Sequence, residues 1–133
     1  MTIENVTVKD SDISGNNKVA AILAHDGGMS SFKIDNCHVE GCVIESLNEE
    51  DGGNVAGLVG LFNSNIEATI KNSSVKKTTI NGINSTNTGK RSNGEFVGCM
   101  GGKDKAVINI IKCDACCTER LRTNSAYGLC MAT

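Results

Sequence analysis

Apolar residues recur at intervals of five along three separate stretches of the chain. One stretch has them at Ile70, Val75 and Ile80. The two earlier stretches have them at Ile3, Val8 and Ile13, and at Ile34, Val39 and Ile44. Apolar and polar residues alternate between these positions, and this period of two indicates half-buried β-strands.

A second apolar run follows each of these three stretches and recurs once more near residue 130. It reads Ala-Ile-Leu-Ala at 21–24, Gly-Leu-Val-Gly at 57–60, Gly-Cys-Met-Gly at 98–101 and Gly-Leu-Cys-Met at 128–131. The runs at 57–60 and 98–101 have glycine at both ends, which makes so short a run poor helix material. We therefore expect a short buried strand at each of these runs.

The two elements together form a repeat. We divide a single domain, residues 1–133, into repeats of approximately 1–31, 32–67, 68–107 and 108–133. Units of this size cannot bury their apolar face alone and stack into solenoids. The repeats contain strand-like runs and no long amphipathic helix. The pattern therefore predicts an all-β fold, a parallel β-helix (β-solenoid) of about four coils, right-handed with about three strands per coil.

Equivalent positions of stacked coils form columns. The predicted core column contains Val8, Val39, Val75 and Ala115, and a second one contains Ile13, Ile44, Ile80 and, after a one-residue slip, Leu121. A third column contains Asn5, Asn36 and Asn72 and ends at Lys112. Asparagine tolerates the left-handed backbone conformation and forms hydrogen-bonded ladders along a stack. We therefore expect this column to be a structural corner ladder.

The run Gly57–Gly60, followed by Ile70–Val75, resembles the GLUG-motif repeats, and Ile34–Val39 supplies the matching segment of the second repeat. The resemblance covers most of the chain through a short motif, and the first and last repeats depart from it. It implies a β-helical scaffold of the kind found in large bacterial surface and secreted proteins, including adhesins. It brings no catalytic residues to this chain.

Composition narrows the classes of partner. Thirteen basic and fifteen acidic residues give a net charge of −2, which offers no attraction for nucleic acid or an anionic membrane. No run approaches the ~18 apolar residues of a membrane span. The segment Met1–Asn5 enters the first repeat directly, so it is not expected to be a signal peptide.

Seven cysteines are many for 133 residues, and their odd number leaves at least one unpaired within the chain. Cys113 and Cys116 have the spacing of a metal knuckle, but there is no second C-x-x-C pair. We therefore expect no metal site and favour buried thiols for most cysteines. Cys116 and Cys117 are adjacent and would face opposite sides of a strand, so one of them is a candidate inter-chain crosslink.

Candidate catalytic groups are sparse. The only histidines are His25 and His38, and neither has a nucleophile and an orienting group at recognisable sequence spacing. The acidic cluster of Glu45, Glu49, Glu50 and Asp51 could bind calcium, but a solvated loop is the simpler interpretation. No column of carboxylates is repeated from coil to coil. We expect no catalytic residues, no cofactor and no enzyme.

The repeat pattern begins at Thr2 and is still legible at Leu129, which predicts open strand edges at both ends of the stack. We therefore expect a non-enzymatic structural or adhesive module, extracellular or at the cell surface. Its expected partner is itself, in an end-to-end homo-oligomer or fibre, with a surface glycan or protein as a further ligand. The alternative is a β-helix that binds or cleaves carbohydrate.

Overall fold

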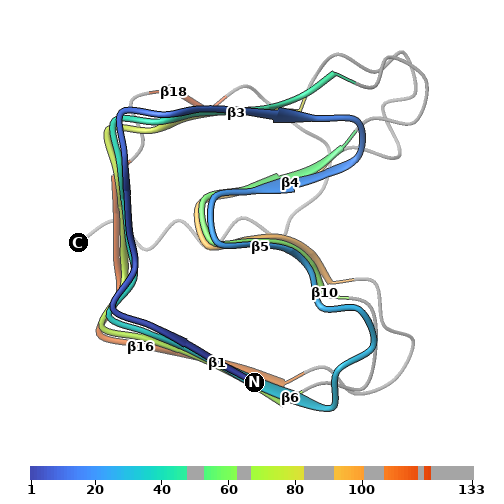
Figure 1. The fold of residues 1–133 in the computed structure, drawn as a ribbon, viewed down its shortest axis with the longest axis vertical. Helices are drawn as coiled ribbons and strands as arrows, with labels where there is room; N and C mark the ends of the chain where they lie inside the picture. Colours follow the sequence, from blue (N-terminus) through green and yellow to red (C-terminus); the bar gives the residue numbers. More distant parts are fainter. Residues whose placement is uncertain (48–52, 63–66, 83–91, 101–106, 117–118, 121–133) are drawn as a thin grey trace.

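The computed structural model describes residues 1–47, 53–62, 67–82, 92–100, 107–116 and 119–120. The described residues form strands and no helix, and every strand pair is parallel. The chain contributes strands to five sheets in turn and returns to the first sheet after every fifth strand, so that successive turns stack on one another (Figure 1). This confirms the predicted all-β architecture of stacked parallel strands.

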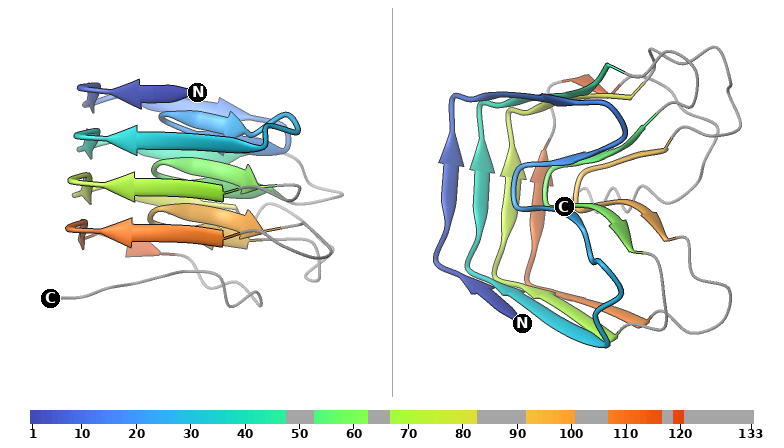
Figure 2. Two further views of the ribbon diagram at one scale, coloured as in Figure 1. Left: turned by 90° about the horizontal axis from the view of Figure 1, so that it is seen from below. Right: turned by 45° about the vertical axis from the view of Figure 1, so that its right-hand side comes forward.

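Three four-stranded sheets form an outer arc. Sheet A contains β1 (Thr2–Glu4), β6 (Ser31–Asp35), β11 (Glu67–Lys71) and β16 (Val107–Ile111). Sheet B contains β2 (Thr7–Lys9), β7 (His38–Glu40), β12 (Ser74–Lys76) and β17 (Asp114–Cys116). Sheet C contains β3 (Asp12–Gly15), β8 (Val43–Ser46), β13 (Thr79–Asn81) and β18 (Glu119–Arg120). In Figure 2 the strands of one sheet lie above one another in chain order.

Two three-stranded sheets bend into the space inside this arc. Sheet D contains β4 (Lys18–Ala20), β9 (Asn54–Ala56) and β14 (Ser92–Gly94). Sheet E contains β5 (Leu23–His25), β10 (Val59–Phe62) and β15 (Val97–Met100). We call β1–β5 the first coil, β6–β10 the second and β11–β15 the third.

The prediction of about three strands per coil was wrong, because each described full coil has five. The second apolar run was expected to be one strand, but in the first two repeats it begins with a two-residue bend, at 21–22 and 57–58, which joins a preceding strand of sheet D to a strand of sheet E. In the third repeat the bend is at 95–96, so the run at 98–101 follows it and does not align with 57–60, because Val59 pairs with Val97. The bend points toward sheet B in Figure 1. Its tip is apolar in the second and third coils, where Leu58 and Phe96 are buried. Folding the run back lets both of its halves contribute to the core.

Glycine permits the close packing of this bend. A β-carbon at Gly57 would lie 2.5 Å from the carbonyl oxygen of Glu95 and 2.6 Å from a methyl group of Val75 in sheet B. A β-carbon at Gly60 would lie 2.6 Å from the carbonyl oxygen of Ala24. The two glycines of the Gly-Leu-Val-Gly run therefore let its backbone lie close to the backbones of the neighbouring coils.

The register aligns the apolar columns. Val8 pairs with Val39, Val39 with Val75, and Val75 with Ala115. Ile3 and Ile34, and Ile34 and Ile70, pair in the same way in sheet A. Val39, Val75, Ile34 and Ile70 are fully buried. The sheet A strands of the later coils begin at Ser31, Glu67 and Val107.

Candidate functional site

Left-handed residues form the corner between sheets A and B. The φ angles are 59° at Asn5, 53° at Asn36, 50° at Asn72 and 52° at Lys112. Asparagine is one of the few non-glycine residues that adopt this conformation readily. The structure thus places the three asparagines of the column above one another at one corner, with a lysine at the same corner of the last sheet A–sheet B connection.

The asparagine side chains form a ladder that is one step long. Asn36 Nδ2 donates to Asn5 Oδ1 at 2.8 Å. The next amide does not continue the series, because Asn72 Nδ2 donates to Asp35 Oδ1 at 2.8 Å. A carboxylate therefore replaces an amide as the acceptor between the second and third coils.

Asp35 is the centre of a small charged cluster beside this corner. Lys33 Nζ lies 2.9 Å and Lys71 Nζ 3.2 Å from Asp35 Oδ2. The hydrogen bonds from Lys33 and then from Asn72 lower the pKa of Asp35 to about 2. The same contact raises the pKa of Lys33. Asp35 is thus held ionised and bonded at both oxygens, which suits a link between coils and not a general acid or base.

His38 bridges two coils on the outer face of sheet B. Its Nδ1 lies 2.8 Å from Ser74 Oγ and its Nε2 lies 2.9 Å from Asn36 Oδ1. The sequence analysis found no partner for His38 at a recognisable spacing and missed this contact. The signal was available in the column alignment, because Ser74 occupies the position of His38 one coil later.

The chemistry of this trio is limited by the backbone around it. A hydroxyl, an imidazole and an amide in a row resemble the nucleophile, base and orienting group of acyl-transfer enzymes. Such enzymes also need free N–H groups to bind an oxyanion. Here the Ser74 N–H donates to the Cys37 carbonyl and the His38 N–H donates to the Val6 carbonyl. These two backbone donors are therefore engaged in the sheet, and the trio acts as a cross-coil link.

Cysteines serve as corner residues. The thiols of Cys37, Cys42 and Cys113 donate to the carbonyls two residues earlier, at 3.5, 3.4 and 3.4 Å. The hydroxyls of Ser73 and Thr78 make the same bond at 2.8 and 2.9 Å. The three thiols are free, and burial raises the pKa of Cys113. These cysteines are small residues that pack and also satisfy a carbonyl.

The remaining candidate groups are only partly described. Cys116 pairs in register with Lys76 in sheet B and Glu45 pairs with Asn81 in sheet C, while Cys117, Cys130, Glu49, Glu50 and Asp51 lie outside the described residues. His25 Nε2 lies 3.3 Å from Asp26 Oδ1, beside a buried carboxylate. Within the described part of the chain, no three or more His, Cys, Asp or Glu residues are grouped as metal ligands.

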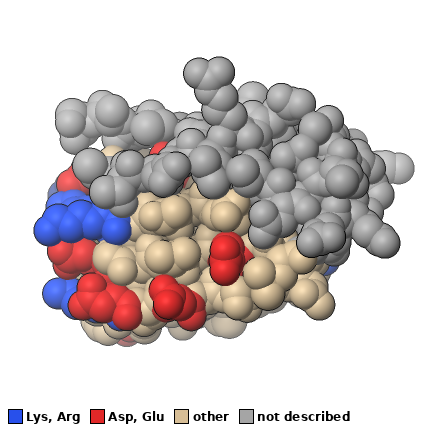
Figure 3. Space-filling view, turned by 90° about the horizontal axis from the view of Figure 1, so that it is seen from above, with Lys and Arg blue, Asp and Glu red and all other residues tan. Residues whose placement is uncertain are grey.

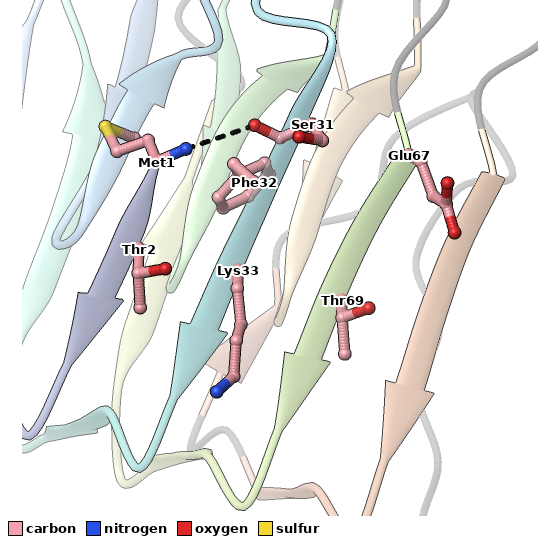
Figure 4. Close-up of a pocket in the computed structure, with 7 residues that line it drawn as sticks. All are labelled: Met1, Thr2, Ser31, Phe32, Lys33, Glu67 and Thr69. Atoms are coloured by element: carbon pink, nitrogen blue, oxygen red, sulfur yellow. Dashed lines mark hydrogen bonds between the residues drawn. The ribbon is translucent and has the colours of Figure 1, made fainter.

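The outer faces offer shallow relief. Figure 3 shows a face on which basic side chains gather along one edge of the described surface, while acidic side chains lie beside them and also further across the face, with uncharged surface between them. Lys9 and Lys77 contact Glu40 at 3.4 and 3.7 Å at the corner between sheets B and C. A depression of about 300 Å³ lies over the start of sheet A, lined by Thr2, Lys33 and Thr69 among others (Figure 4). The Phe32 ring beneath it is 4 % exposed and gives no stacking platform.

The end of the stack at the first coil is open among the described residues. The strands β1, β2 and β3 pair with the second coil on one side, and no described strand pairs with them on the other. Their inward residues Ile3, Val8 and Ile13 are only partly buried, although each lies in a column that is buried one coil later. This end combines unpaired strand edge with apolar surface.

The described part of the opposite end is less regular. Ile80 pairs with Arg120, so the expected slip that would bring Leu121 into this column was wrong for the described register. An arginine thus occupies the position that Ile13, Ile44 and Ile80 hold in the earlier coils. Sheets D and E have three strands each in the described chain, against four in sheets A, B and C.

Comparisons with known proteins found no matching family model, no matching curated protein and no matching solved structure. The resemblance to GLUG-motif repeats therefore stays a prediction from the motif. The part of the chain that the structure describes has no helix that could cross a membrane.

Proposed function

We propose that this chain is a non-enzymatic structural module that associates end to end through the open strand edge of its first coil. The observation that carries this proposal is the contrast in burial between Val8, which is half-buried, and Val39, which is fully buried. Both belong to one column, but Val39 has a described register partner on each side and Val8 has one on a single side, which accounts for the difference. Covering the open end would bury apolar surface and would also pair the backbone N–H and C=O groups of the edge strands.

The finer picture of this module is part of the same proposal. We take it to be a right-handed β-solenoid of about four coils, related to the GLUG-motif repeats and displayed outside the cell or at its surface in an adhesive role. The cross-coil bonds of Asp35 and His38 support a scaffold, because they use polar side chains to connect coils. The inter-chain crosslink proposed for Cys116 or Cys117 would form away from this contact, because Cys116 lies in β17, at the other end of sheet B from β2.

A carbohydrate-directed β-helix is the alternative, and the described surface favours it less. Sugar sites commonly offer an aromatic face, whereas Phe32 and Phe96 are both buried. A glycan array with a parallel turnover assay distinguishes the two functions. Binding or cleavage of a defined glycan by the monomer would replace the structural proposal.

The direct test is the assembly state of the purified chain. We expect the mass from sedimentation velocity to rise with protein concentration, and electron microscopy to show particles elongated along the coil axis. Reductant should leave association intact and remove any covalent species that depends on Cys116 or Cys117. A monodisperse monomer at the highest concentration would contradict end-to-end association.

A further inference from the structure

The backbone groups at the open end can be assigned from the bonds of the second coil. The N–H groups of His38 and Val43 point toward the first coil, where they donate to the carbonyls of Val6 and Ser11. Thr7 and Asp12 occupy the positions of His38 and Val43 in the first coil. Their N–H groups therefore point out of the open end.

The acceptors follow from the same comparison. The carbonyls of Asp35 and Glu40 accept the N–H groups of Asn5 and Asp10 in the first coil. Glu4 and Lys9 are the counterparts of Asp35 and Glu40, so their carbonyls also point out of the end. The Lys9 carbonyl already accepts a hydrogen bond from the Ser11 hydroxyl at 2.7 Å. Its counterpart, the Glu40 carbonyl, accepts two bonds, one from the Cys42 thiol and one from the Asp10 N–H. The Lys9 carbonyl can therefore accept a second donor as well.

The first coil is nearly symmetric about Val8. The strand β2 is centred on Val8, a two-residue corner flanks it on each side, and β1 and β3 continue beyond the corners. Figure 1 shows β1 and β3 on opposite sides of the coil and running in opposite directions. A half-turn about an axis through Val8 therefore places β3 of one copy over β1 of another with the two strands antiparallel.

We propose that the open end binds the same end of a second copy of this chain, with a twofold axis through Val8. This inference rests on the proposed end-to-end association and names its partner, symmetry and register. The Thr7 N–H meets the Lys9 carbonyl of the second copy, and the Asp12 N–H meets its Glu4 carbonyl. Each of these two donors thus meets an acceptor that is also directed out of the end.

The apolar residues agree with this register. Val8 lies against Val8 of the second copy, and Ile3 lies against its Ile13. These three are the inward residues at the centres of β1, β2 and β3, and each is only partly buried in the single chain. Pairing therefore completes the core columns and the backbone ladders in one contact.

The opposite end is the poorer partner for this edge. In a head-to-tail stack, the sheet C position that precedes Ile13 would be taken by Arg120 of the next copy, because Arg120 is the last described member of that column. That column would then read Ile80, Arg120 and Ile13 in order, whereas the twofold contact pairs Ile13 with Ile3. The twofold contact also closes on itself, so a fibre would require a second interface elsewhere.

One feature of the register opposes binding and makes it testable. Glu4 faces Asp12 of the second copy, and symmetry repeats this pair of like charges. Opposed like charges across strands cost a few tenths to about 1 kcal/mol each, so Glu4→Gln should tighten the dimer roughly 2- to 30-fold. In a head-to-tail stack these two residues lie on the same edge and never meet.

The register itself is tested by disulfide trapping between different variants. Residues that exchange backbone bonds in an antiparallel pair lie about 5.5 Å apart between Cα atoms, within the ~4.4–6.8 Å of a disulfide. A mixture of Thr7→Cys and Lys9→Cys chains should form a mixed disulfide on mild oxidation, identified by peptide mass spectrometry. Each variant alone should not form its own dimer at that cysteine.

Thr7→Cys mixed with Lys76→Cys is the matched control, because Lys76 lies in the column of Lys9 two coils away. The trapped yield should be several-fold higher for Lys9→Cys than for this control. Equal yields would overturn the twofold register. If sedimentation still showed dimers, end-to-end association would stand with another geometry, whereas monomers at all concentrations would overturn both proposals.

Discussion

The first and second coils hold corresponding residues in different surroundings. Val8 and Val39 are register partners, yet Val8 is half-buried and Val39 is fully buried. In the sheet A column, Glu4 is exposed, whereas its partner Asp35 bonds Lys33, Lys71 and Asn72. Position in the repeat thus decides which way a side chain faces. The neighbouring coil decides what that position contributes to stability.

The largest expected effect separates Val39 from Val8. Val39→Asp places an unpaired carboxylate in a closed core, which costs several kcal/mol and is comparable with a total stability of ~5–15 kcal/mol. We expect this variant to be unfolded by circular dichroism. Val8→Asp should stay folded, because its side chain can reach water at the open end, and it should lose self-association. Equal unfolding of both variants would contradict the open end.

A smaller effect is expected from the glycines. Gly57→Ala would bring a β-carbon against the Glu95 carbonyl and two Val75 methyl groups, and such overpacking costs about 1–3 kcal/mol. Gly15→Ala in the first coil is the control, since its β-carbon would meet only one Val19 methyl group at 3.2 Å. Urea unfolding of the two variants measures the difference. A cost for Gly57→Ala no greater than that for Gly15→Ala would contradict close packing at the bend.

The corner asparagines should differ in the bonds that they lose. Glycine keeps the left-handed backbone accessible, so a glycine substitution tests the side chain. Asn36→Gly removes the hydrogen bonds of Asn36 to Asn5 and to His38. Asn5→Gly removes only the bond between Asn5 and Asn36. At about 0.5–1.5 kcal/mol for each bond, less where water competes, Asn36→Gly should be the more destabilising in urea unfolding. The reverse order would show that the ladder contributes little.

The smallest effect is the pH dependence that Asp35 introduces. Its pKa in the folded chain is about 2, below the ordinary value of 3.8. A lowered folded pKa means that the contribution is fully present above about pH 4 and is lost as the pH falls toward 2. Asp35→Asn should therefore flatten the fall in stability over this window. Chemical unfolding of the wild type and of Asp35→Asn at a series of pH values checks this, and an equally steep fall in both would contradict the contribution of Asp35.

The local sequence pattern alone was sufficient to predict the stacked strands of the outer arc, sheets A, B and C. The five-residue spacing reflects three strand residues and a two-residue corner, so it predicted parallel stacked strands with Val8, Val39 and Val75 in one column. Asparagine marked the corner because few other residues tolerate a positive φ. These features depend on short-range backbone geometry and on alternation, which any single repeat displays.

The tertiary structure decided the inward bend, the cross-coil bonds and the difference between the ends. The run around Leu58 reads as one apolar strand, and only the contact of Gly57 with Val75 and Glu95 shows why it folds back. The bond between His38 and Ser74 joins residues 36 positions apart, so it exists only once the register is set. The openness of Val8 depends likewise on which strand lies beside it. Side-chain direction is a property of the local chain, whereas burial and bonding are properties of its neighbours.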